Sequence, residues 1–269
     1  MTLKNAISVL ILAGVTASCS TVVTDKPVTY TPDSDSQNKR VAAKTVDEYA
    51  TAIQAMDEMS SYLRSLKKFT VTADVSFDEV LDNGQKVLLD KLVDIRVEMP
   101  SKLWAKSSTY YNEKEFYFNG ETFTLYTPNL GYFASFDMPA TIGQLAIKAN
   151  QKYAIEIPIV DLFLWGTAAD SSVTAVEEAR IIGVDNVNGV SCNHFAFRAA
   201  EIDWQICIQR DGTPLPLKLV ITEKNVATQP QHITILTWNT SPDLNAQNYT
   251  FTPHDGDQEI SFSKVNTDK

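Results

Sequence analysis

The sequence predicts an α+β protein that is mainly antiparallel sheet, with about eleven strands in a half-open barrel, a long N-terminal helix and a helical plug. Three observations lead to this prediction. Asn-Gly turns separate runs in which apolar and polar residues alternate. A capping box near residue 45 precedes an amphipathic helical pattern. A very apolar segment near residue 160 interrupts the strands.

The hairpin turns define the strand pattern. Asn-Gly supplies the positive φ angles that both central residues of a two-residue type I′ turn need. The strands are therefore expected in two meanders, roughly 69–136 and 177–239, with a terminal strand near 259–263. The predicted turns are Asn83-Gly84, Asn119-Gly120, Asn188-Gly189 and, with Asp in place of Asn, Asp211-Gly212.

Two helical segments interrupt the strands. Thr45-x-x-Glu48 is a capping box, and apolar residues follow at three- and four-residue spacing, so residues 46–66 are predicted as an amphipathic helix. A second box, Thr141 with Gln144, begins a segment that ends in the apolar run 158–165. A helix that is apolar almost all round must be buried or must cover something apolar, so this run is the expected plug.

The N-terminus has the pattern of a secretion signal. Residues 1–18 contain one lysine, an apolar run and then small residues before Cys19, and the run is too short to span a bilayer. The end of this segment resembles the bacterial lipoprotein signal, in which the cysteine is lipidated and becomes the mature N-terminus. A plain signal peptide cut near Ala17 is the alternative. The serine directly after this cysteine, Ser20, resembles the pattern of lipoproteins that are sent to the outer membrane.

A polar segment follows the predicted anchor. Residues 19–44 are rich in Ser, Thr, Asp and Pro and are expected to form a flexible tether, which leaves residues 45–269 as a single domain. Without residues 1–18 the chain has 22 basic and 33 acidic residues, because one of the 23 basic residues lies in the signal. A net charge of −11 argues against nucleic acid as a partner.

The stretch CNHFAFRAAEIDWQIC, residues 192–207, is predicted as two strands joined at Ala199-Ala200. In that register Cys192 lies opposite Cys207, within disulfide range, and an oxidising compartment favours the bond. The period of two then places the apolar side chains on one face and His194, Asp203 and Gln205 on the other. This stretch is therefore expected to form a wall of the fold.

Motifs for catalysis and for metal or cofactor binding are lacking in the sequence. Its three histidines, at 194, 232 and 254, have no zinc-ligand spacing, and no nucleotide-binding or nucleophile-elbow motif occurs. We therefore expect no enzyme activity, no metal and no cofactor. A disulfide would remove the thiolate of a Cys-His dyad, so His194 is expected to be a hydrogen-bonded strand residue. A hydrolase built on His194 and Asp203 is the least favoured alternative.

Several segments together resemble a bacterial family of predicted periplasmic proteins of unknown function. They are Tyr117-Phe118-Asn119-Gly120, Tyr153-x-Ile155-x-Ile157-Pro158, Gly189-Val190-x-Cys192-x-His194, Asp203-Trp204-Gln205 and Pro214-Leu215-Pro216. The marks span about residues 45–262. The family is similar in fold to the lipoprotein-localisation proteins (LolA/LolB-like), whose half-open barrel carries helices as a lid over an apolar concave face. The family commonly has Trp where this chain has Cys207, so we expect the disulfide to be a feature of this chain and not of the family.

The expected function is that of a binding protein facing the periplasm. A rolled sheet with an apolar inner face has either a filled core or a cavity for an apolar ligand, such as an acyl chain or a lipoprotein lipid. The alternative is an envelope interaction module with a filled core, whose protein partner the sequence does not identify. The candidate lining residues are Phe116, Phe118, Leu162, Phe163, Trp165, Phe195, Phe197, Trp204 and Ile206.

Overall fold

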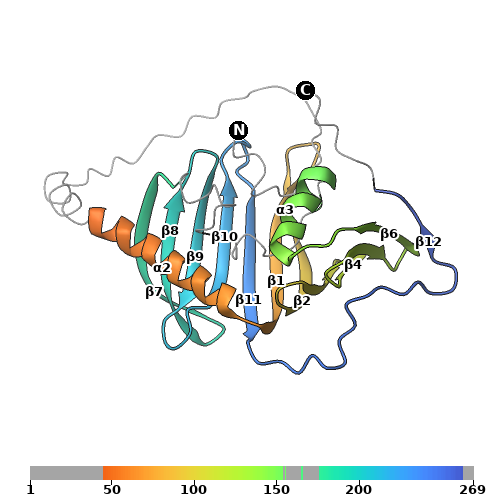
Figure 1. Ribbon diagram of the computed structural model, residues 1–269. Helices are drawn as coiled ribbons and strands as arrows, with labels where there is room; N and C mark the ends of the chain where they lie inside the picture. The colour runs from red at the N-terminus through yellow and green to blue at the C-terminus, as the bar shows by residue number, and fades with distance from the viewer. Residues whose placement is uncertain (1–44, 154, 156–164, 166–175, 263–269) are drawn as a thin grey trace, which may run out of the picture.

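The computed structural model describes residues 45–153, 155, 165 and 176–262 (Figure 1). The predicted signal (1–18), the lipidation site Cys19, the tether (19–44) and most of the plug lie outside these residues. Within the described part, no helix is long and apolar enough to span a membrane.

One antiparallel meander with a helix at each end forms the first half of the fold. It begins with the predicted long helix, which ends one residue earlier than expected. The elements are α2 (Thr45–Ser65), β1 (Lys68–Val80), β2 (Lys86–Glu98), β3 (Lys102–Ser108), β4 (Glu113–Phe118), β5 (Thr122–Thr127), β6 (Tyr132–Asp137) and α3 (Ile142–Tyr153).

A second meander and a short terminal strand form the other half. The described part has twelve strands, one more than the sequence predicts. The elements are β7 (Glu178–Val187), β8 (Val190–Arg198), β9 (Ile202–Gln209), β10 (Pro216–Glu223), β11 (Gln231–Asn239) and β12 (Gln258–Glu259).

All twelve strands form a single open sheet, in the order β12-β6-β5-β4-β3-β2-β1-β11-β10-β9-β8-β7. The two meanders join where β1 pairs with β11 in antiparallel fashion, and β12 adds to β6 as a parallel strand. Because β12 and β7 are the two ends, the sheet does not close within the described residues. The predicted fold class, a mainly antiparallel α+β protein with an open barrel, is confirmed.

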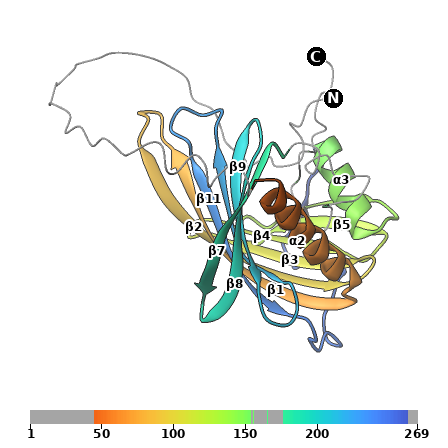
Figure 2. The ribbon, with the colours of Figure 1, turned by 90° about the vertical axis from the view of Figure 1, so that its left-hand side faces the viewer.

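Both helices lie on the concave side of the curved sheet (Figure 2). Alternation fixes this face: in β1 the buried Val71, Ala73 and Val75 alternate with partly or fully exposed polar residues. The facing stripe of α2 recurs at three- and four-residue spacing and is at most 2% exposed. We call this side of the sheet the helix-covered face. The stripe consists of Ala52, Met56, Met59 and Leu63.

The turns differ from one another more than the sequence suggests. Asn188 and Gly189 have φ angles of 50° and 86°, which confirms the two-residue type I′ turn. The prediction is wrong at the other two Asn-Gly pairs, where only the glycine has a positive φ. There the loops are longer, because Val80 pairs with Lys86 and Phe118 with Phe123.

The asparagine side chains explain these longer loops. Asn83 Oδ1 accepts a hydrogen bond from the Gln85 N–H at 3.0 Å, and Asn119 Oδ1 accepts from the N–H groups of Glu121 and Thr122, each at 2.9 Å. Such bonds from an asparagine to backbone two residues further on build an Asx turn without a left-handed asparagine. The dipeptide alone therefore did not determine the turn type.

The N-terminus of α3 confirms the second predicted capping box. The Thr141 N–H donates to Gln144 Oε1 at 3.0 Å, and the Gln144 N–H donates to Thr141 Oγ1 at 3.4 Å. Two backbone donors that have no partner inside the helix are thereby satisfied. The box directs the chain from the sheet edge into a helix that buries Ile142, Leu145, Ala146 and Ala149.

Candidate functional site

Seven of the nine candidate lining residues lie in the described part, and all seven are buried, at most 9% exposed. Six of the seven lie on strands and share the helix-covered face. Strand pairing links them into one continuous face through β4, β3, β2, β1, β11, β10, β9 and β8. Leu162 and Phe163 lie outside the described residues. The seven are Phe116, Phe118, Trp165, Phe195, Phe197, Trp204 and Ile206.

Three of these residues form an aromatic cluster over β8 and β9. The rings of Phe197 and Trp204 stack with centroids 4.0 Å apart and an interplanar angle of 11°. Trp165 packs edge-on against Trp204 at 5.6 Å and lies 6.4 Å from Phe197. The sequence prediction that these side chains share one apolar wall is consistent with this packing.

Trp165 is bound to α2 as well as to the sheet. Its indole Nε1–H donates to Asp57 Oδ1 at 3.0 Å. Its carbonyl oxygen accepts from Ser60 Oγ at 3.0 Å and from the Arg64 guanidinium at 2.7 Å. These bonds satisfy the polar atoms of a nearly fully buried tryptophan. The end of the apolar run is thus held between α2 and the sheet.

Phe116, another predicted lining residue, belongs to a second aromatic cluster on β4–β6. Phe116 lies 6.3 Å from Phe123, and Phe123 lies 5.2 Å from Phe136 and 6.4 Å from Phe262. Phe123 is completely buried. A continuous series of rings therefore leads from the packed face of β4 to the end of the sheet at β12.

A cleft of about 380 Å³ opens at that end of the sheet. β12 pairs with β6 only at Tyr132 and Phe133, and Ile260 N–H donates to the Phe133 carbonyl at 2.8 Å. The rings of Phe136, Tyr153 and Phe262 lie 4.8–5.4 Å from one another at this point. The cleft is lined by Ser135, Phe136, Tyr153, Glu259, Ile260, Ser261 and Phe262.

None of the seven described lining residues lines this cleft, so sequence reasoning missed it. Its rings come from β6, the last residue of α3 and the segment after β12, which lie far apart in the chain. The predicted terminal strand near 259–263 was the available signal. It placed Phe262 on a strand, but the partner strand could not be identified from the sequence.

The stretch from Cys192 to Cys207 forms a hairpin in a different register from the predicted one. Its turn centres on Ala200-Glu201, one residue later than expected, because the Ala199 N–H donates to the Ile202 carbonyl. Opposed residue numbers therefore sum to 401, so Cys207 faces His194 and Cys192 faces Gln209. The predicted opposition of Cys192 to Cys207, and of His194 to Gln205, is wrong.

The disulfide is present despite the shifted register. Cys192 and Cys207 are bonded as diagonal neighbours, with Cα atoms 5.5 Å apart, and both are buried. A shift of two residues keeps every side chain on its predicted face, because the side-chain period is two. The face prediction therefore survived an error in the turn.

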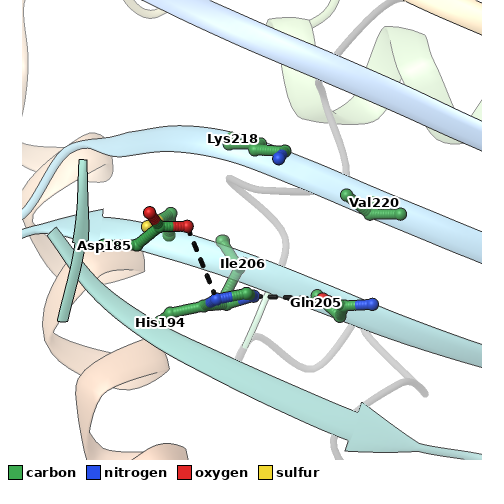
Figure 3. A pocket seen from close by; sticks show the side chains of 7 residues that line it. Asp185, His194, Gln205, Ile206, Lys218 and Val220 are labelled. Carbon is green, nitrogen blue, oxygen red and sulfur yellow. Dashed lines mark hydrogen bonds and ion pairs between the residues drawn. The ribbon is translucent and has the colours of Figure 1, made fainter. Parts of the chain in front are cut away.

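The polar face of this hairpin carries a small group of side chains (Figure 3). His194 Nε2 lies 3.1 Å from Gln205 Oε1, and His194 Nδ1 lies 3.8 Å from Asp185 Oδ2. The hollow between these residues and Lys218 has no room for a water molecule. His194 is thus a hydrogen-bonded strand residue, as predicted.

Asp203, the other member of the hydrolase alternative, is bound elsewhere. Its carboxylate accepts from Arg198 Nε at 3.2 Å and pairs with Lys224 Nζ at 3.1 Å. Burial raises the pKa of this carboxyl, but the two cations more than offset it and hold the pKa below its ordinary value. Among the described residues, no group of three or more His, Cys, Asp or Glu could hold a metal ion.

His232 on β11 is a titratable group on the helix-covered face. Its ring stacks on Phe77 at 6.1 Å, and its Nδ1 is buried without a hydrogen-bond partner among the described atoms. Burial, together with the charge of Lys91, lowers the pKa of His232 to about 4. The imidazole is therefore neutral at pH 7.

Several solved structures are similar to this chain at low identity. The lipoprotein LppX of Mycobacterium tuberculosis has a TM-score of 0.44 and 10% identity, covering 73% of this chain and 99% of LppX. LprF of Mycobacterium bovis has a TM-score of 0.43 and 12% identity, covering 72% of this chain and 94% of LprF. A LolA superfamily protein of Nitrosomonas europaea has a TM-score of 0.35 and 6% identity, and the match covers 74% of this chain and 97% of that protein.

The sequence itself matches a protein family over most of its length. No curated protein matches the chain. The model of the family described as predicted periplasmic protein (DUF2092) matches residues 52–263, which include the whole sheet and 14 of the 21 residues of α2. The chain therefore belongs to this family of predicted periplasmic proteins.

Proposed function

We propose that the protein is a non-enzymatic lipoprotein on the periplasmic side of the envelope that binds a hydrophobic ligand, such as an acyl chain or a lipoprotein lipid. The observation that carries this proposal is the aromatic cleft beside β12. Its volume, about 380 Å³, lies within the range of roughly 300–1,000 Å³ typical of ligand pockets. Cys19, through its lipid, would attach the domain to the outer membrane.

The cleft has an apolar part, formed by three rings and one aliphatic side chain, beside serine and glutamate groups. Phe136, Tyr153 and Phe262 offer ring faces, and Ile260 at the rim is 51% exposed. Behind them Phe123 continues the apolar surface towards Phe116. A flexible hydrocarbon chain gains free energy from each methylene that leaves water, about 0.8 kcal/mol. A ligand bound beside β12 would lie against these rings at the edge of the packed core.

The alternative, an envelope interaction module with no ligand, also has an observation in its favour. The seven described candidate lining residues are part of the hydrophobic core, and each is at most 9% exposed. In that reading the interior is filled and the cleft beside β12 is only a surface feature. A ligand titration separates the two proposals.

The polar groups among the described residues support the proposal that the protein is not an enzyme. Cys192 and Cys207 are joined in a disulfide, His194 bonds Gln205, and Asp203 is held by two cations. Nucleophilic catalysis requires a nucleophile within hydrogen-bond reach of a base. These groups do not form such a pair.

A fluorescent fatty acid titrated into the chain carrying Cys19→Ala tests the binding proposal. We expect saturable binding that Ile260→Asp weakens at least about tenfold, because the charge would have to be desolvated beside the ligand. Leu88→Asp on β2 is the matched control, since Leu88 is 61% exposed and does not line the cleft. No saturable binding would favour the interaction module. Equal binding by both variants would place the ligand elsewhere.

Metabolic labelling tests the proposed anchor separately. Cells given a labelled palmitate should incorporate the label into the wild-type chain and not into Cys19→Ala, and the labelled chain should fractionate with the outer membrane. A chain that is never labelled and is found free in the periplasm would favour cleavage near Ala17 instead.

A further inference from the structure

The two ends of the sheet differ in how they are finished. At one end β12 covers part of β6. At the other end lies β7, a strand of ten residues whose outer side pairs with no strand of the described residues (Figure 1). An edge strand offers free backbone N–H and C=O groups to any strand placed beside it.

β7 also exposes an apolar surface that an edge strand usually avoids. Ile181, Ile182 and Val184 are 40%, 57% and 59% exposed. Exposed edges are usually shortened, charged or covered, because otherwise they template pairing with another chain. β7 is long and has apolar residues at its centre, so it favours a partner strand.

The sequence of β7 is complementary to itself in one antiparallel register. When opposed residue numbers sum to 365, Arg180 of each copy faces Asp185 of the other, and Ile181 faces Val184. A two-fold axis then passes between positions 182 and 183. The register places two opposite-charge pairs and two apolar pairs across the boundary, and cross-strand pairs of both kinds stabilise a sheet.

A bulge in β7 makes this register possible. Opposed side chains must lie on the same face, and in a regular strand residues 181 and 184 would lie on opposite faces. The ladder with β8 shifts between Ile181 and Gly183. As a result Ile181 and Val184 share the helix-covered face, and Arg180 and Asp185 share the outer face.

We infer that β7 is the interface of a symmetric dimer, in which two copies join their sheets through antiparallel β7 strands. Arg180 and Asp185 make only exposed ion pairs within their own chain. Arg180 lies 3.4 Å from Glu178 and Asp185 lies 3.8 Å from His194, and the side chains of Arg180 and Asp185 are 41% and 49% exposed. Exposed ion pairs of this kind contribute little free energy, so replacing them with ion pairs across the edge costs little.

The size of the interface sets the strength of the association. One strand edge buries less surface than the standard stable interface of about 1,600 Å². We therefore expect a reversible dimer whose population rises with protein concentration. Tethering to a membrane surface, if Cys19 is lipidated, would raise the local concentration and favour it.

Sedimentation velocity over a wide concentration range, on the chain with Cys19→Ala, tests this inference. The wild-type β7 should give a monomer–dimer equilibrium. Arg180→Asp and Asp185→Arg should each weaken the dimer at least about tenfold, because each change creates two like-charge pairs across the edge. The controls are Lys114→Asp and Asp82→Arg, the same charge reversals at exposed positions away from β7. These should leave the dimer unchanged.

Mixing the two variants gives the decisive result. An Arg180→Asp chain carries two acids at these positions and an Asp185→Arg chain carries two bases, so the equimolar mixture should form a heterodimer as strong as the wild-type dimer. A loss of folding in either variant could not produce that recovery. A wild-type chain that stays monomeric at every concentration, a dimer that neither variant weakens, or a mixture without recovery would each overturn the inference.

Discussion

The disulfide is a residue-scale feature with a measurable contribution to stability. Cys192 and Cys207 are 15 residues apart and buried, so their bond restricts the unfolded chain without exposing the sulfurs in the folded one. The chain-entropy model gives about 3 kcal/mol for a loop of this length. Urea unfolding of Cys192→Ala/Cys207→Ala should show a loss of that order, and Cys19→Ala should show none. A double variant as stable as wild type would contradict this account.

His232 makes stability depend on pH in a defined window. Its folded pKa of about 4 is lower than the ordinary 6.5, so the unfolded state binds more protons as the pH falls. The unfolding free energy should therefore be unaffected above pH 6.5 and fall between pH 6.5 and pH 4, by roughly 2–3 kcal/mol at the lower limit. His232→Phe should remove this part of the loss, because phenylalanine can stack on Phe77 without a charge.

A matched variant isolates the effect of His232. His254→Phe changes an exposed histidine that contacts Asp257 and not His232, so it should keep the fall of the unfolding free energy that is assigned to His232. The carboxyls whose pKa is lowered, Asp78, Asp203 and Asp257, are present in both wild type and His232→Phe, so their contributions cancel in that comparison. Identical acid-side slopes for wild type and His232→Phe would show that the ring is not buried neutral.

At the scale of elements, the turns give a direct prediction. Asn188 has a φ of 50°, whereas Asn83 in the β1–β2 loop has no positive φ. Alanine tolerates the left-handed region poorly, so Asn188→Ala should lower the unfolding free energy by about 1 kcal/mol. Asn83→Ala loses only the exposed bond to Gln85 and should cost less. Equal losses in thermal or urea unfolding would contradict the difference in turn type.

The elements also show which features could be predicted from the sequence. Period-two alternation and capping boxes depend on local chemistry, so the strands, α2 and the start of α3 were predictable within a few residues. The β8–β9 register was not, because shifting the turn by one residue changes the opposed pairs but leaves both faces unchanged. The turn types at Asn83 and Asn119 depended on side-chain bonds within each loop.

At the scale of the whole molecule, the sequence predicted the wall but not the cleft. The phenylalanines of β4 and β8 and Trp204 of β9 lie on one helix-covered face, as alternation indicated. The cleft depends on β12 pairing with β6, a parallel contact between segments about 125 residues apart, which no local pattern encodes. Sequence reasoning therefore identified the buried apolar face but not the cleft at the β12 end of the sheet.

Native mass spectrometry of the Cys19→Ala chain, followed by organic extraction, tests the central claim most directly. We predict a discrete adduct of lipid mass on the purified protein, lost in Ile260→Asp and kept in Leu88→Asp. Bare protein at its calculated mass, still bare after incubation with fatty acids and phospholipids, would contradict ligand binding. The protein would then be an interaction module with a filled core.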